Sequence, residues 1–116
     1  MVLPGDFKSL IDQANALRVY DKLIVQLNKD LRLANMDLNF SEDIIPLDLK
    51  LSLQDALCHV MQNRFHEYLN LLYVIDVSEK KIKALDASDL VALSEAVTFL
   101  ILQREWQKVW YKLKYS

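Results

Sequence analysis

The chain has almost no glycine, since Gly5 is the only one among its 116 residues. A P-loop needs glycines to bring backbone amides onto phosphates, and a Rossmann turn needs three of them. The sequence therefore excludes both kinds of nucleotide-binding loop. Tight β-hairpins also rely on Gly or Asn-Gly turns, so the same scarcity argues against a protein built from hairpins.

Cysteine is also scarce, and the chain has no excess of positive charge. Cys58 is the single cysteine, so no internal disulfide can form, and a secreted disulfide framework is excluded. The formal net charge is −2, whereas nucleic-acid-binding domains are usually basic, and we expect no nucleic-acid partner. The start of the chain does not resemble a signal peptide, and the most apolar stretch, 90–102, is too short for a membrane span. We therefore expect a cytoplasmic protein.

The composition is that of a folded globular protein, with 53% hydrophobic and 26% charged residues. A chain of 116 residues fits one domain, which we expect to cover residues 1–116. Apolar side chains recur every seven residues at the start of this domain, at Leu10, Leu17, Ile24, Leu31 and Leu38. Such a seam predicts one long first helix of roughly 30 residues.

A long connection is expected over 35–46, where cap residues and Pro46 disfavour helix. The following run alternates leucine with polar residues, at Leu47, Leu49, Leu51 and Leu53. We interpret it as an extended segment packed across the helices, and a helix stays open as the alternative. A second helix with a wide apolar face is predicted over 53–73, a short third helix near 80–85, and a last helix of about 25 residues from residue 90. The expected fold is all-α and resembles a four-helix bundle.

A polar stripe on the predicted second helix could bind a ligand. His59, Asn63 and His66 are spaced four and three residues apart, which places them on one helix face. The two histidines are separated by about 10 Å of helix rise, a spacing that does not favour one shared metal ion. We expect no metal or cofactor, and a solvated stripe is the plain alternative. Glu95, inside the most apolar helix, is either a buried acid or an exposed, ion-paired group.

The two tryptophans suggest a contact with another protein chain. Trp106 and Trp110 lie four residues apart on the last helix, and such residues are frequent interface anchors. We expect a homodimer, or a complex with another protein, whose candidate interface combines this pair with Leu47, Leu49 and Leu51. Packing within the chain's own bundle is the alternative for the tryptophans. Arg104 and Glu105 are interpreted as ion-paired groups on the surface.

Two stretches, LYVIDVSEKKI at 72–82 and LILQREWQKVWYK at 100–112, resemble small bacterial helical proteins of unassigned function. The resemblance implies a cytoplasmic all-α protein and supplies no catalytic residues. No nucleophile with a partnering base is evident in the sequence either. The leading hypothesis is therefore a non-enzymatic interaction protein that acts as a homo-oligomer, and the alternative is a small-molecule- or metal-binding bundle that uses His59 and His66.

Overall fold

The computed structural model describes residues 2–115, and every regular element in this range is a helix. The helices are α1 (Phe7–Ala16), α2 (Tyr20–Leu33), α3 (Pro46–Asn63), α4 (Phe65–Ile75), α5 (Glu79–Lys83) and α6 (Leu90–Tyr115). The prediction of an all-α protein is confirmed, whereas the number and lengths of the helices differ from the four-helix expectation.

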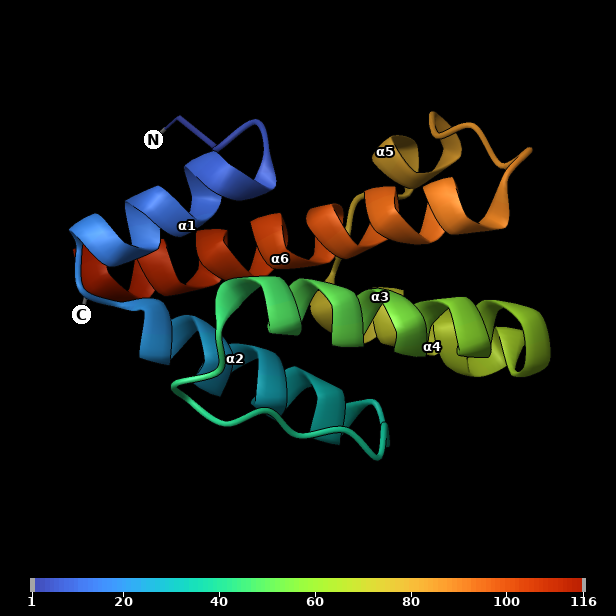
Figure 1. Cartoon of the computed structure of the whole chain (residues 1–116), viewed down its shortest axis with the longest axis horizontal. Coiled ribbons are helices and arrows are strands. Elements are labelled where there is room, and N and C mark those ends of the chain that lie inside the picture. Colours follow the sequence, from blue (N-terminus) through green and yellow to red (C-terminus); the bar gives the residue numbers. More distant parts are fainter. Residues whose placement is uncertain (1, 116) are drawn as a thin grey trace.

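The last helix is the axis of the molecule. α6 runs along its whole length, and α1, α2, α3 and α4 all pack against it (Figure 1). Its start is marked by Asp89, whose carboxylate accepts a hydrogen bond from the backbone N–H of Val91 at 3.0 Å. Val97, Ile101 and Trp106 are buried on the faces that meet the other helices. The predicted long last helix is confirmed, with 26 residues.

The predicted long first helix is wrong. The chain turns between α1 and α2, where Arg18 adopts a left-handed backbone with a φ of 57°. The backbone N–H of Val19 then bonds to the carbonyl of Ala14 at 2.9 Å, which is a helix-ending pattern that glycine usually provides. Leu17, a member of the seven-residue repeat, is largely exposed at this turn.

The interpretation of 47–53 as an extended segment is also wrong, because these residues belong to α3. Pro46 occupies the first turn of this helix, where its fixed φ and missing N–H cost nothing. Leu49, Leu53 and Leu57 are fully buried, and their spacing of four residues forms one helix face. Leu49 and Leu53 fit both a repeat of two residues, as in a strand, and a spacing of four residues, as on a helix face. The alternation of leucines therefore did not indicate an extended segment.

The predicted second helix is two helices. α3 ends at Asn63, Arg64 has a non-helical backbone, and α4 runs back behind α3 (Figure 1). α4 ends at Asp76, which adopts a left-handed backbone with a φ of 67°. The short helix α5 follows at once and lies on the opposite side of α6 from α3 (Figure 1).

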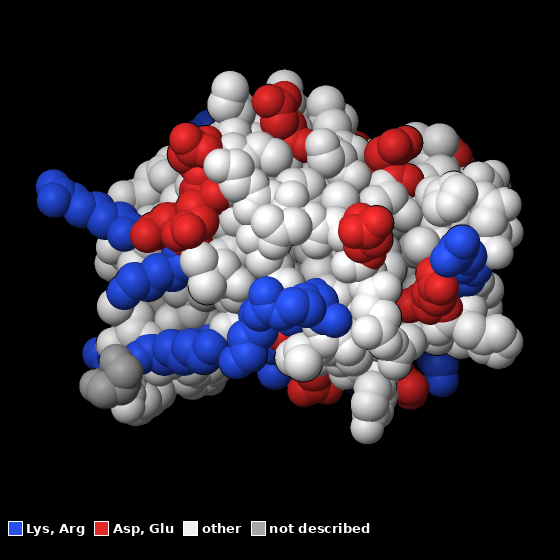
Figure 2. Space-filling view, turned by 90° about the horizontal axis from the view of Figure 1, so that it is seen from below, with Lys and Arg blue, Asp and Glu red and all other residues white. Residues whose placement is uncertain are grey.

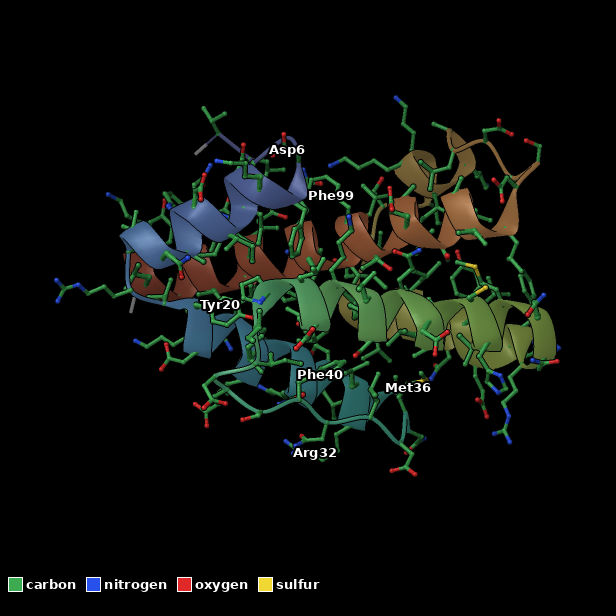
Figure 3. All side chains as sticks on the ribbon, viewed as in Figure 1. Asp6, Tyr20, Arg32, Met36, Phe40 and Phe99 are labelled. Atoms are coloured by element: carbon green, nitrogen blue, oxygen red, sulfur yellow. The ribbon has the colours of Figure 1, made fainter. Side chains whose placement is uncertain are left out.

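The long connection, residues 34–45, is fixed to α2 by side chains of that helix. Asn28 exchanges two hydrogen bonds with the backbone of Phe40, each of 2.8 Å. Tyr20 donates its hydroxyl to the carbonyl of Ile44 at 2.6 Å, and burial raises the pKa of Tyr20 to about 12, which keeps this donor protonated. Figure 3 shows Tyr20 at the start of α2 and Phe40 on the connection that returns along it.

Candidate functional site

A row of exposed apolar side chains with an adjoining hollow lies on α4. Phe65, Leu69 and Tyr73 are four residues apart and form one row along the outer face of this helix. Their exposed fractions are 54%, 45% and 84%. The sequence predicted a wide apolar face here but assigned it to the interior. We call these three residues the α4 row.

A hollow of about 760 Å³ lies beside the α4 row. It is bounded by α4, α5 and the start of α6, and Leu72, Ile82, Leu85 and Leu93 are among its lining residues. Its volume is in the range of ligand or side-chain pockets, and its wall is predominantly apolar. We call this hollow the α4–α5 groove.

The groove exists because the chain reverses sharply after α4. The left-handed Asp76 lets the N–H of Val77 bond to the carbonyl of Leu72 at 3.0 Å, which closes the helix end. Ser78 then caps α5 by accepting a hydrogen bond from the N–H of Lys81 at 3.3 Å. This turn sets α5 next to α4 and leaves the space between them open.

Charges of opposite sign stand at the two ends of the α4 row. Arg64 lies at its N-terminal end, and within residues 2–115 its ion pair is with Glu67, 3.2 Å away on the exposed surface. Asp76 and Glu79 lie at its C-terminal end and line the groove. Exposed pairs within a chain are weak, so these charges can also serve a partner.

A cluster of polar side chains is buried between α2 and α6. Glu105 of α6 is fully buried, so the expectation that it lies on the surface is wrong. As a carboxylate it would have no hydrogen-bond donor in correct geometry, although Lys108 Nζ lies 3.4 Å from its Oε1. As a carboxylic acid it could donate a hydrogen bond to the neighbouring, buried Asp30 of α2. Burial and the neighbouring carboxylate of Asp30 therefore favour a proton on Glu105.

The electrostatics of this pair agree with that geometry. Burial, and then the hydrogen bond and charge of Asp30, raise the pKa of Glu105 to about 9. Burial alone would raise the pKa of Asp30. The interactions of Asp30 with Glu105 and with Lys108, whose Nζ lies 2.6 Å away, outweigh burial and hold the pKa of Asp30 below its ordinary value. Gln26 and Lys112 extend the cluster toward solvent. Because Glu105 is inaccessible, the pair joins α2 to α6 and does not face a substrate.

Charged side chains are unevenly distributed on the face of the molecule seen from below in Figure 2. In the view from below, Lys and Arg side chains form a band from the centre toward the end at which the chain terminates, whereas Asp and Glu are scattered (Figure 2). Lys108 and Lys112 contribute cations beside the buried pair. The band lies on a different side of the molecule from α5, which is hidden in this view.

The structure does not join the predicted histidine stripe into one site. His59 and Asn63 belong to α3, His66 belongs to α4, and all three are exposed. Asn63 Nδ2 lies 3.2 Å from His59 Nδ1, so these two contact each other. Glu95 is exposed and lies 3.8 Å from Lys50 Nζ. Within residues 2–115, no group of three His, Cys, Asp or Glu side chains could hold a metal ion.

The predicted interface residues fall into two groups. Leu47 and Leu51 are exposed on α3. Leu49 and Trp106 are fully buried in the chain's own core, and the indole N–H of Trp106 donates to Gln13 Oε1 at 3.3 Å. Trp110 is half-buried. The sequence did not reveal the α4 row, although the spacing of Phe65, Leu69 and Tyr73 could have indicated it.

Comparison with known proteins found no matching protein family, no matching characterised protein and no matching solved structure. In the described part of the chain, no helix is both long and apolar enough to cross a membrane.

Proposed function

We propose that this protein is a non-enzymatic interaction protein that forms a homodimer through the α4 row and the α4–α5 groove. The observation that carries the proposal is the position of Tyr73, which is 84% exposed and stands directly at the rim of an apolar hollow. An aromatic ring in water beside an unfilled apolar wall favours burial in a partner.

A second copy of the chain fits this surface because it offers both a projection and a recess. With the two α4 helices antiparallel about a two-fold axis, Leu69 faces its own copy, and Phe65 faces Tyr73 of the other chain. Tyr73 of each chain then enters the groove of the other. Such self-complementary patches are the basis of two-fold symmetric dimers.

The charges at the ends of the row support the same arrangement. Antiparallel pairing brings Arg64 of one copy to Asp76 and Glu79 of the other, so opposite charges meet at both ends of the interface. A parallel arrangement would place like charges together, which costs free energy. The charge pattern therefore favours the antiparallel homodimer over other pairings of the same helices.

Sedimentation equilibrium and native mass spectrometry of the whole chain test this proposal. We expect a dimer at micromolar concentration, and at least a tenfold weaker association in Leu69→Asp, because a buried carboxylate would face its own copy. Leu51→Asp is the matched control, since Leu51 has a similar exposure on α3. Circular dichroism checks that each variant stays helical. A monomeric wild-type protein, or a monomeric Leu51→Asp variant beside a dimeric Leu69→Asp variant, would contradict the proposal.

A charge reversal tests the antiparallel geometry separately. We expect Arg64→Glu to weaken the dimer, because it puts a carboxylate opposite Asp76 and Glu79 of the other copy at each end of the row. Adding Glu79→Arg should restore association by returning opposite charges to each end. A double variant that is weaker than Arg64→Glu alone would exclude the antiparallel pairing.

A further inference from the structure

A second hollow, of about 450 Å³, lies on the other side of the segment 76–78 from the α4–α5 groove. It is formed between this segment, α5, Leu3 near the start of the chain and the part of α6 over residues 100–111. Its wall carries two cations, Lys81 and Arg104, and one carboxylate, Asp76. The hollow therefore has a positive balance in a chain whose net charge is −2.

Arg104 is held in place before any ligand binds. Its Nε donates to the backbone carbonyl of Asp76 at 3.0 Å, and its Nη1 donates to Gln107 Oε1 at 3.2 Å. Its Nη2 lies 3.3 Å from the Asp76 carboxylate. Within residues 2–115, one N–H on each terminal nitrogen is then left without an acceptor. The side chain is only 28% exposed, so its position is well defined.

The ionic partner of Arg104 is easily displaced. The Asp76 side chain is 82% exposed, and an exposed ion pair contributes little stability. If the carboxylate rotates into solvent, the bond from Nε to the Asp76 carbonyl still anchors the guanidinium. A guanidinium held in this way is suited to a planar carboxylate or a phosphate.

Lys81 supplies a second cation whose charge has no carboxylate partner in the described chain. Its Nζ donates to the neutral oxygen of Gln103 at 3.4 Å, and Gln103 is fixed in turn by a 2.9 Å bond from its Nε2 to the carbonyl of Pro4. Tyr111 contributes an aromatic ring to the same wall. The wall thus combines two cations, amide groups and a flat apolar surface.

We propose that this hollow binds a small planar organic anion, whose acidic group is held by Arg104 and Lys81 and whose ring lies against Tyr111. The volume falls within the range of small-molecule sites. The proposal does not depend on the homodimer, because Lys81, Arg104 and Tyr111 are outside the α4–α5 groove.

Titration of the whole chain followed by NMR tests the proposal, with benzoate, phenyl phosphate, inorganic phosphate and neutral benzamide as probes. We expect saturable shifts of the Gln103 and Gln107 side-chain amides and of Arg104 Nε with benzoate or phenyl phosphate. These two probes distinguish a carboxylate site from a phosphate site. Benzamide should bind at least tenfold more weakly, because it lacks the charge, and inorganic phosphate more weakly because it lacks the ring.

Two substitutions complete the test. Lys81→Gln should weaken binding of the anionic probe at least fivefold, whereas Lys80→Gln, the adjacent lysine of α5 that does not line the hollow, should leave it unchanged. Asp76→Asn should strengthen binding severalfold, because it removes the competing carboxylate, and asparagine tolerates the left-handed backbone. Absence of saturable binding, equal binding of benzoate and benzamide, or equal effects of the two lysine substitutions would overturn the proposal.

Discussion

Glu105 on α6 and Asp30 on α2 are buried next to each other, and Lys108 Nζ lies 3.4 Å from Glu105 and 2.6 Å from Asp30, so a hydrogen bond between the two carboxyl groups needs a proton on Glu105. Folding therefore stabilises an acid in its neutral form at a pH at which an exposed glutamate is ionised. The packing of α2 on α6 consequently depends on pH.

We predict that the free energy of unfolding decreases as the pH rises from about 5 toward 9. In the folded protein Glu105 binds its proton up to a pKa of about 9, whereas in the unfolded chain it loses it near 4.5. Between these values the folded state holds one more proton, so stability falls by at most about 1.4 kcal/mol per pH unit from this group. Urea denaturation at several pH values measures the slope.

Glu105→Gln should remove most of this slope, because an amide is neutral at every pH and can still donate to Asp30. At pH 8 we expect the variant to exceed the wild type by about 1–3 kcal/mol. Glu95→Gln, at an exposed position of the same helix, is the control and should keep the wild-type slope. A Glu105→Gln variant that retains the slope would show that Glu105 is not the group that titrates.

The two bonds between Asn28 and the backbone of Phe40 should hold the whole connection 34–45. We expect Asn28→Ala to lower the free energy of unfolding by about 1–3 kcal/mol, because it leaves a partly buried N–H and a carbonyl without partners. Limited proteolysis within 34–45 should become faster. Asn39→Ala, on the exposed part of the same connection, should change neither quantity. Equal cleavage rates in the two variants would contradict this assignment.

Arg18 imposes a backbone cost that a glycine would relieve. Its φ of 57° is left-handed, and its side chain is exposed. We expect Arg18→Gly to raise the free energy of unfolding by about 0.5 kcal/mol, the net of released strain and greater freedom of the unfolded chain. Asn35→Gly is the control with a φ of 60°, and it should gain less, because asparagine tolerates this region. Thermal denaturation of both variants compares them, and a loss of stability in Arg18→Gly would disprove the argument.

The sequence predicts those parts of the fold that local signals determine. α6 is clear because Asp89 caps a long apolar stretch. The break at 17–19 is not evident from the sequence, because the leucine repeat continues through it. Its left-handed position is occupied by Arg18, whereas a glycine there would have indicated a turn. The helix at 47–53 is hidden because Leu49 and Leu53 satisfy both a period of two and a spacing of four.

The candidate sites depend on tertiary contacts, which the sequence shows less well. Glu105 follows Ile101 by four residues and precedes Val109 by four, so its position on the buried face could be inferred, but its partner Asp30 is 75 positions away. The α4–α5 groove arises from the reversal at Asp76, again a left-handed residue that is not glycine. The histidine stripe failed to form because Arg64 interrupts the helix that was to carry it.

The position of Asp76 has a consequence for regulation. Its carboxylate belongs to the linings of both hollows and can serve only one of them at a time. An anion on Arg104 would release it toward Arg64 of a second copy, so ligand binding and dimerisation would favour each other. Thermodynamic linkage then makes the effect reciprocal: with one anion site per chain, saturating anion would strengthen the dimer by the square of the factor by which dimerisation strengthens binding at each site. The exposed side chain of Asp76, at the end of α4, would thus couple the binding of a small anion to dimerisation.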